Sequence, residues 1–545
     1  MRLGIIDLGS NTVRLVVWEI YGRGFYRTIQ EQKKNIRLGE QSHNPEIAED
    51  KIEETVTTLR EFRRFCENLD VGRIIVVATE AVRRAPNQKD FLARIQTETG
   101  FEPVVLCQHE EAYLDFRGVT GSMEVKNSLM VDIGGSSTEL VWIKDNQMME
   151  NISVPIGTLD LTEDFELADI VKTEAKTAME KKLLEAFSSI DWIRENVFST
   201  MILVGGSARA IGRIERYRTR YPLTLTHNYS LSCQDIKALY YHFMTKNAAT
   251  RAKTQGLERN RSDLILGALA IIHTLCRCNG LSELRISGKG LREGILHEHL
   301  TSHYDCYPSM LDASLFAIIS HHNLNRDHAL HVHRLAKICF DALVEKGQLD
   351  ASQEDVLKCA AYLHDSGLSI RYYDHEKHSF YLILNSEING LNHKEILLAA
   401  LAARYHRKVE TEPSIVPYTH LINKMDLYTA ERLGLFIALG EAFDLSLSGL
   451  VYDLDCAVLD ERFVLRPHAS EDVSMEIHKA MKIKDKFQEL FHLCLTILDP
   501  VTEQEAKSQP FPPALPKPEE KKSPLEEVCE AFRKRQLRAP SEANE

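Results

Sequence analysis

One pattern occurs twice in this sequence, at residues 5–12 (IIDLGSNT) and at residues 130–138 (MVDIGGSST). In each copy an apolar strand ends in aspartate, a turn of glycine and small polar residues follows, and a second apolar strand begins. Glycine lets backbone N–H groups approach an anionic oxygen, and aspartate oxygens suit a divalent metal. The repeat therefore predicts two facing hairpins that clamp one phosphate chain, with Asp7 and Asp132 holding a metal between them.

The composition predicts a large globular protein of several domains. The chain has 545 residues and a formal net charge of −13, which disfavours a general nucleic-acid binder. Its 11 cysteines form no CxxC pair, so we expect free thiols rather than a disulfide framework or a zinc site. No signal peptide or bilayer-length apolar run is recognised, so the sequence predicts a cytoplasmic protein without membrane insertion.

Strand and helix patterns divide the chain into five expected parts. Alternating patterns predict two α/β domains with a cleft between them, at residues 1–125 and 126–308. From residue 309 the strand signals vanish and histidines multiply, which predicts an all-α domain over 309–450. A small α+β domain with one helix over residues 473–495 is expected at 451–499. The end, 500–545, is rich in Pro, Lys and Glu and is expected to be a disordered tail.

Further polar residues follow predicted strands of the front half. Open α/β sheets bind ligands at the carboxyl ends of their strands, where we expect Arg83 and Glu111. The forked donors of arginine match phosphate oxygens, and a carboxylate can activate water. A third glycine turn contains Gly206 and Ser207. Each motif alone is compatible with an ordinary turn, a surface pair or a helix start, but their coincidence at strand ends favours a phosphate site.

Together these motifs resemble the exopolyphosphatase/guanosine pentaphosphate phosphatase (Ppx/GppA) family in order and in separation. The matching segments are residues 7–11 (DLGSN), 78–83 (ATEAVR), 110–112 (EEA), 132–140 (DIGGSSTEL), 205–207 (GGS) and 290–294 (GLREG). The resemblance covers the first two predicted domains. It implies an actin-like (ribonuclease H-like) fold of duplicated α/β domains with a cleft.

The resemblance also implies a role for each matching residue. Glu111 corresponds to the base that activates water, and Arg83 to an arginine that contacts phosphate. The implied cofactor is Mg²⁺ or Mn²⁺, with Asp132, Glu139 and Asp7 as its ligands. The implied phosphate-binding residues are Asp7, Gly9, Ser10, Asn11, Gly134, Gly135, Ser136, Ser137, Gly206 and Ser207.

One residue departs from the family pattern. Ser136 stands where the family usually has a third glycine. Serine keeps the backbone N–H, but its Cβ disfavours a positive φ. We expect little loss, unless this position needs a left-handed backbone, in which case phosphate affinity falls.

The helical domain carries a second pattern, which resembles that of HD phosphohydrolases. His328, the adjacent pair His364 and Asp365, and the later Glu441 match positions that hold a divalent metal from separate helices in that family. The resemblance implies a second divalent metal in this HD-like domain. The alternative is a relict domain whose histidines and basic residues line a channel for a long anion without binding a metal.

The expected activity is that of an exopolyphosphatase, which hydrolyses the terminal phosphate of inorganic polyphosphate with water activated by Glu111. Three alternatives remain: 5′-phosphohydrolysis of guanosine pentaphosphate (pppGpp), a non-catalytic sensor of polyphosphate or nucleotide, and a kinase of the actin-like superfamily. The resemblance also implies a homodimer. The basic residues expected along a polyphosphate groove are Arg83, Arg84, Lys289, Arg292, Arg404, Arg407 and Lys408.

Overall fold

The computed structural model describes residues 1–39, 46–307, 309–407 and 415–502, and these residues form two compact units. The first unit comprises residues 1–337 and 351–440, and the second comprises residues 338–350 and the described residues from 441 onward. Lys408 and almost all of the expected tail lie outside the described residues.

The first sheet has the strand order β3-β2-β1-β4-β5. Its strands are β1 Arg2–Leu8, β2 Val13–Tyr21, β3 Phe25–Lys34, β4 Arg73–Ala78 and β5 Val104–Val105. Strand β1 pairs antiparallel with β2 and parallel with β4. The parallel pairing places the carboxyl ends of β1 and β4 at the same edge of the sheet.

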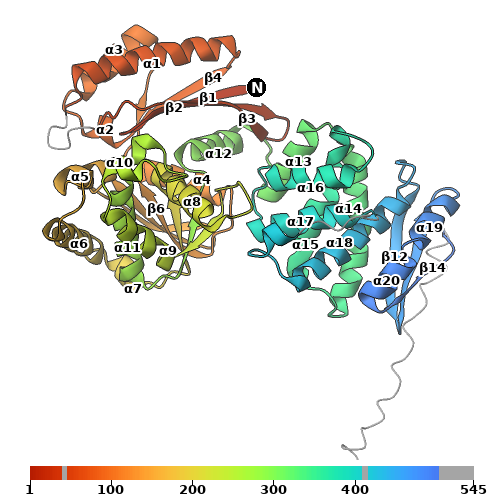
Figure 1. Ribbon diagram of the computed structural model, residues 1–545. Coiled ribbons are helices and arrows are strands. Elements are labelled where there is room, and N and C mark those ends of the chain that lie inside the picture. Colours follow the sequence, from red (N-terminus) through yellow and green to blue (C-terminus); the bar gives the residue numbers. More distant parts are fainter. Residues whose placement is uncertain (40–45, 308, 408–414, 503–545) are drawn as a thin grey trace, which may run out of the picture. The chain divides into compact units, whose positions relative to one another are not determined.

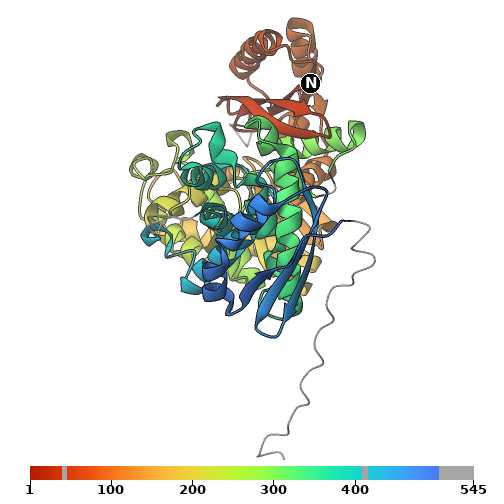
Figure 2. The same ribbon diagram turned by 90° about the vertical axis from the view of Figure 1, so that its right-hand side faces the viewer.

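Helices cover both faces of this sheet, because β1 alternates apolar side chains between them. Ile6 and Leu8 are buried against α1 (Glu49–Asn68) and α3 (Gln88–Thr99). Leu3 and Ile5 are buried on the other face, against α12 (Leu291–His303). Figure 1 shows α1 and α3 together on one side of the strands, and Figure 2 shows the same layering from the side.

The second sheet repeats the plan of the first, with the order β10-β11-β9-β6-β7-β8. Its strands are β6 Asn127–Ile133, β7 Thr138–Lys144, β8 Gln147–Val154, β9 Thr200–Val204, β10 Tyr229–Ser232 and β11 Glu283–Ile286. Strand β6 pairs antiparallel with β7 and parallel with β9, as β1 does with β2 and β4. The expected duplication of an α/β domain is therefore present.

The remaining helices of this half connect or cover the two sheets. They are α2 Glu80–Arg84, α4 Gln108–Thr120, α5 Thr158–Asp164, α6 Thr173–Ser188, α7 Asp191–Glu195, α8 Gly205–Thr219, α9 Cys233–Met244, α10 Ala248–Arg251, η1 Arg259–Arg261 and α11 Ile265–Asn279. Cys233 and Cys276, on α9 and α11, form a disulfide, so the expectation of free thiols is wrong for this pair. The sequence gives no signal for this pairing, because the two cysteines meet only when α9 packs against α11.

The region that follows is helical. Its elements are α13 Met310–His321, α14 Arg326–Glu345, η2 Ala351–Gln353, α15 Glu354–Leu363, η3 Ser366–Ser369, α16 His375–Asn385, α17 His393–Tyr405, η4 Val416–Tyr418 and α18 Lys424–Phe443. Within residues 309–407 and 415–440 it contains no strand. In the part of the chain that the structure describes, no helix combines the length and the apolar character that crossing a bilayer requires.

The second unit contains a sheet of order β12-β13-β14. Its elements are β12 Val451–Leu459, β13 Arg462–Ala469, α19 Ser474–Met481, α20 Lys484–Phe491 and β14 Cys494–Ile497. The single helix expected near residues 473–495 is thus two helices and a strand. His492 takes a positive φ of 56° and ends α20. Leu495 then pairs with Phe463 of β13 and is buried.

Candidate active site

The two repeated segments form matching hairpins. In the first, the N–H of Gly9 donates to the carbonyl of Thr12 at 3.1 Å. In the second, the N–H of Gly134 donates to the carbonyl of Ser137 at 2.9 Å. The strand registers also agree, since Asp7 pairs with Arg14 across one hairpin as Asp132 pairs with Glu139 across the other. The two turns therefore correspond residue by residue.

The tips of these hairpins lie side by side. A Cβ added to Gly135 would stand 3.1 Å from the Cβ of Ser10, which belongs to the other hairpin. This is the facing arrangement that the repeated sequence led us to expect. Ser136 is not among the residues with a positive φ, so the third turn position needs no left-handed backbone and tolerates serine.

A polar cavity of about 150 Å³ lies at these tips. Of the residues expected from the sequence, those that line it are Asp7, Gly9, Ser10, Asn11, Glu111, Asp132, Gly134, Gly135, Ser137, Gly206 and Ser207. Arg83, Ser136 and Glu139 do not line it. Oδ1 of Asp7 and both side-chain polar atoms of Asn11 are buried without a hydrogen-bond partner. Such atoms indicate that a ligand supplies the missing partners.

Glu111 enters the cavity from the first turn of α4. The helix starts here because Glu110 caps it, accepting a hydrogen bond from the N–H of Cys107 at 2.7 Å. Arg83 Nη1 donates to Glu111 Oε2 at 3.0 Å, and Arg83 Nη2 donates to Glu80 Oε2 at 2.5 Å. Burial raises the pKa of Glu111 well above its usual range, although Arg83 opposes this. Arg83 therefore holds the carboxylate rather than reaching the cavity itself.

Three further carboxylates gather near Glu111, and we call Glu111, Asp115, Asp132 and Glu139 the acidic cluster. Asp115 lines the cavity one helical turn beyond Glu111, and both of its oxygens are buried without a hydrogen-bond partner. Burial and then repulsion from Asp132 raise the pKa of Asp115. Sequence reasoning missed Asp115, although its spacing of four residues from Glu111 on a helix was a usable signal.

Glu139 lies behind the cavity and anchors the second hairpin. Its Oε1 accepts hydrogen bonds from the hydroxyls of Ser137 at 2.6 Å and Ser153 at 2.9 Å. Burial and then the charge of Asp132 raise the pKa of Glu139 to about 7. Buried carboxylates that raise one another's pKa supply oxygen ligands, and a divalent cation bound to them would neutralise their negative charge. Asp7, Asp115 and Asp132, which line the cavity, fit such a cation with oxygen ligands.

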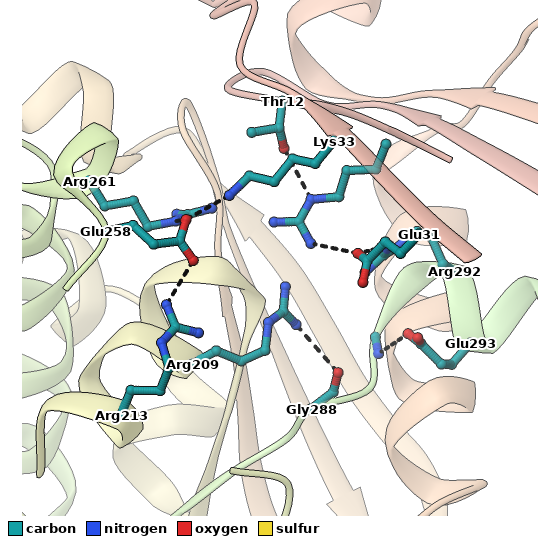
Figure 3. Close-up of polar contacts among 12 residues, drawn as sticks. Thr12, Glu31, Lys33, Arg209, Arg213, Glu258, Arg261, Gly288, Arg292 and Glu293 are labelled. Carbon is teal, nitrogen blue, oxygen red and sulfur yellow. Dashed lines mark hydrogen bonds and ion pairs between the residues drawn. The ribbon is translucent and has the colours of Figure 1, made fainter. Parts of the chain in front are cut away.

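Four arginines line the same cavity and form what we call the basic cluster: Arg14 on β2, Arg209 on α8, Arg261 on η1 and Arg292 on α12. Figure 3 shows the guanidinium groups of Arg209, Arg261 and Arg292 approaching from different elements. Burial and repulsion by other arginines lower the pKa of Arg14 to about 10. Buried, crowded cations of this kind are typical of a site for a polyanion.

Two glutamates form ion pairs with basic residues at or beside the cavity (Figure 3). Glu31 Oε1 accepts from Arg292 Nη1 at 2.8 Å. Glu258 accepts from Lys33 at 2.7 Å and from Arg213 at 2.9 Å. Of the expected groove residues that the structure describes, only Arg292 lines the cavity. Lys289 instead bonds Glu387 at 3.0 Å.

The third glycine turn brings the start of α8 to the cavity. Gly205 has a φ of +89°, and a Cβ there would stand only 2.4 Å from Asp132 Oδ1. Glycine is therefore required on two grounds, backbone conformation and close approach. The turn places Gly206 and Ser207 at the N-terminus of α8, where free N–H groups and the helix dipole favour an anion.

The second expected site brings together more residues than the sequence indicated. The Nε2 atoms of His328 and His364 each lie 3.7 Å from Asp365 Oδ2. His375 Nε2 lies 3.2 Å from Asp365 Oδ1 and 3.3 Å from His406 Nε2. Glu441 belongs to the second unit, so its role as a ligand stays a prediction.

Comparison with known proteins identifies the family. The Ppx/GppA phosphatase family matches residues 16–303, more than half of the chain, and its domain III matches residues 312–440. The Aquifex aeolicus family member is 30% identical over 55% of this chain and 98% of its own, with a TM-score of 0.49. An exopolyphosphatase from Cytophaga hutchinsonii is 25% identical over 56% of this chain and 100% of its own, with a TM-score of 0.53. The expected actin-like duplicated fold is thereby confirmed, and the chain belongs to the Ppx/GppA phosphatase family.

Proposed function

We propose that this phosphatase is an exopolyphosphatase, which uses Mg²⁺ or Mn²⁺ to release orthophosphate from the end of inorganic polyphosphate. The observation that carries the proposal is one cavity lined by acidic residues, by four arginines that are buried or half-buried, and by glycine turns. A bound divalent cation would neutralise charge on the non-bridging phosphate oxygens. The arginines would neutralise the following phosphates, each with a forked pair of donors.

In the proposed reaction, water attacks the terminal phosphorus and Glu111 takes a proton from that water. The bond from the terminal phosphorus to the bridging oxygen breaks, and the shortened chain leaves with that oxygen. Arg83 keeps Glu111 oriented through its 3.0 Å hydrogen bond. The N–H groups of the glycine turns and of the α8 N-terminus would hold the phosphate oxygens during the transfer.

The cavity lining favours polyphosphate over a nucleotide. Among the described residues that line this cavity, none has an aromatic side chain. A nucleobase would gain stacking energy from such side chains, whereas a phosphate chain needs charge and donors. In the alternative reaction, on pppGpp, the guanosine would have to lie beyond the cavity.

The test compares turnover of long-chain polyphosphate and of pppGpp by the same purified protein with Mg²⁺. We expect EDTA to stop phosphate release from both substrates. With Mg²⁺, we expect kcat/KM to be higher for polyphosphate than for pppGpp. Faster turnover of pppGpp would favour the nucleotide reaction. Binding of polyphosphate without phosphate release by the unaltered protein would favour the sensor and overturn the proposal.

A further inference from the structure

The structure contains a second cavity, of about 600 Å³, that the proposed reaction does not use. It is lined by the start of β3, by the C-terminal ends of α4 and α12, and by α13 and the end of α16 (Figure 1). Among the described residues, none lines both this second cavity and the polar cavity at the hairpin tips, which we call the phosphate cavity. We propose that the second cavity is a regulatory site for an uncharged molecule of nucleoside type, which combines a planar heteroaromatic ring with hydroxyl groups.

Apolar surface exceeds polar surface in the lining of the second cavity. Phe25 and Tyr26 line it from β3, and Tyr307 lines it just before α13. Leu300 and Met310 add aliphatic surface. Small-molecule sites have volumes of about 300–1,000 Å³ and are mostly apolar, with a few placed polar groups. Aromatic side chains stack on planar rings, so this lining favours a planar organic molecule over an inorganic anion.

Three of the lining residues carry polar groups that can orient such a ring. The Tyr26 hydroxyl lies 3.4 Å from Nε2 of His297, and the side chain of Asn389 also hydrogen-bonds Tyr26. Burial and then the charge of Arg117 lower the pKa of His297 to about 4, so this imidazole is neutral at neutral pH. A hydroxyl, a neutral imidazole and an amide can each donate and accept hydrogen bonds without carrying charge. They suit the edge of a nucleobase.

The lysine, arginine and acidic side chains of the lining are already paired with opposite charges. The pairs are Arg27 with Glu19 at 2.7 Å, Arg117 with Glu298 at 2.6 Å and Glu387 with Lys289 at 3.0 Å. A charged ligand group that leaves water without a free counter-charge costs free energy. The second cavity therefore favours an uncharged ligand, whereas the basic cluster of the phosphate cavity favours an anion.

Helices α4 and α12 extend from one cavity to the other. The first turn of α4 brings Glu111 to the phosphate cavity, and Thr120 at its end lines the second cavity. In the same way, α12 begins with Arg292 at the phosphate cavity and brings Thr301 to the second cavity. A ligand in the second cavity would therefore contact the ends of two helices whose other ends carry the proposed base and an arginine of the basic cluster.

These two helices are packed too closely to move independently. A Cβ on Gly118 would overlap the carbonyl group of Gly290, which precedes α12, and a Cβ on Gly294 would overlap that of Leu114. Close-packed contacts of this kind transmit displacement. A ligand that restrains the helix pair reduces the entropy that is lost when a second ligand orders it. The nucleoside should therefore lower the KM for polyphosphate, an expectation that rests on the proposed exopolyphosphatase activity.

The first test measures the binding of adenosine and of inosine to the unaltered, full-length protein by calorimetry, without polyphosphate. The two nucleosides present opposite donor and acceptor patterns at the ring edge, and we expect at least one of them to bind at one site per chain. AMP should displace it at least about tenfold less well, because its phosphate finds no free counter-charge in the cavity. Absence of binding by both nucleosides, or equal displacement by AMP, would overturn the proposal.

Substitutions locate the bound nucleoside. Ala317 lines the cavity from α13, so Ala317→Phe should fill it and abolish binding. Ser320→Phe is the matched control, because Ser320 is exposed on the same helix and does not line the cavity. Tyr26→Phe removes one oxygen and should weaken binding about fivefold, which keeps the test decisive if the larger side chain impairs folding. Unchanged affinity in both Ala317→Phe and Tyr26→Phe would place the nucleoside elsewhere and overturn the proposal.

The second test measures polyphosphate hydrolysis with and without the saturating nucleoside. Coupling between two sites is typically about 5- to 150-fold, so we expect KM to fall about fivefold or more in the unaltered protein and in Ser320→Phe. Ala317→Phe should hydrolyse polyphosphate but not respond to the nucleoside. A KM that does not fall would overturn the regulatory role. If the unaltered protein does not hydrolyse polyphosphate, the proposed function fails, while the binding test still decides whether the second cavity holds a nucleoside.

Discussion

The phosphate cavity and the histidine cluster of the helical region, which comprises His328, His364, Asp365, His375 and His406, present different atoms. The cavity is built at the tips of two strand hairpins, so it offers backbone N–H groups, short acidic side chains and arginines. The cluster is built between helices, which supply long side chains whose rings are fixed by the carbonyls of the preceding turn. The hairpin tips therefore present hydrogen-bond donors to an anion, whereas the helical region gathers oriented imidazoles around one carboxylate.

The carboxylates of the two regions have opposite electrostatic environments. Burial and neighbouring acids raise the pKa of Glu111. Burial acts the same way on Asp365, but the charges and hydrogen bonds of His364 and His375 outweigh it and hold the pKa of Asp365 below its usual range. Burial thus outweighs the neighbouring Arg83 at Glu111 and raises its pKa, whereas the histidines outweigh burial at Asp365 and lower its pKa. This difference determines how each region should respond to substitution.

The largest effect should come from Glu111→Gln, which removes the proposed base and leaves the side-chain shape. We expect kcat for polyphosphate to fall by about 10²- to 10⁴-fold, while polyphosphate still binds. The measurement is phosphate release together with equilibrium binding. Glu110→Gln is the matched control, since Glu110 is the adjacent residue, caps α4 and does not line the cavity.

The comparison between the two regions would fail if Glu111→Gln kept full activity. It would equally fail if Asp365→Asn abolished phosphate release from polyphosphate. The first result would remove Glu111 from the mechanism, and the second would move the reaction towards the helical region.

The next effect concerns the basic cluster. Arg292→Gln removes a forked donor at the cavity, and a hydrogen bond between charged groups is worth about 1.5–3 kcal/mol. We therefore expect kcat/KM for polyphosphate to fall roughly ten- to a hundred-fold, mostly through KM. Arg285→Gln is the control, because Arg285 bonds Glu283 on β11 and does not line this cavity. Equal losses in both variants would contradict a specific role for Arg292.

Local patterns made the hairpins predictable, and packing explains what was missed. Residues 5–12 and 130–138 each contain their strand, aspartate and glycine turn within one short segment. The basic cluster comes from four separate elements, so Arg14, Arg209 and Arg261 show their common purpose only when the chain is folded. The same holds for His406, which reaches Asp365 through the packing of α16 against α17. The implied homodimer involves a second chain and stays a prediction.

A smaller loss of turnover is expected from two glycine substitutions, which distinguish backbone strain from displacement of a cavity residue. Gly205→Ala and Gly280→Ala both place a Cβ on a residue of positive φ, at +89° and +60°. Each should lose about 1–2 kcal/mol of stability. Only at Gly205 does the new Cβ meet Asp132, whereas Gly280 has open space around it. We therefore expect Gly205→Ala to unfold at a lower temperature than Gly280→Ala, and Gly205→Ala alone to lose polyphosphate turnover, about tenfold or more. Matching activities in the two variants would show that Asp132 tolerates displacement.

The smallest effect is a dependence of stability on pH that Mg²⁺ should remove. Burial raises the pKa of Glu139 to about 7, from an ordinary value of 4.5. Between these values the folded chain binds more protons than the unfolded chain, so this residue lowers the stability of the metal-free protein as the pH rises through that window. A cation on the acidic cluster opposes the loss, so Mg²⁺ should raise the unfolding temperature more at about pH 8 than at about pH 5.5.

Two variants test the assignment to Glu139. Glu139→Gln should flatten the dependence of metal-free stability on pH, and Glu124→Gln, at an exposed position, should not, because only a buried carboxylate gains from staying protonated. If Mg²⁺ raises the unfolding temperature equally at both pH values, the prediction is contradicted. The acids near the cavity would then already be ionised and stabilised by neighbouring positive charges, as Asp365 is by its histidines.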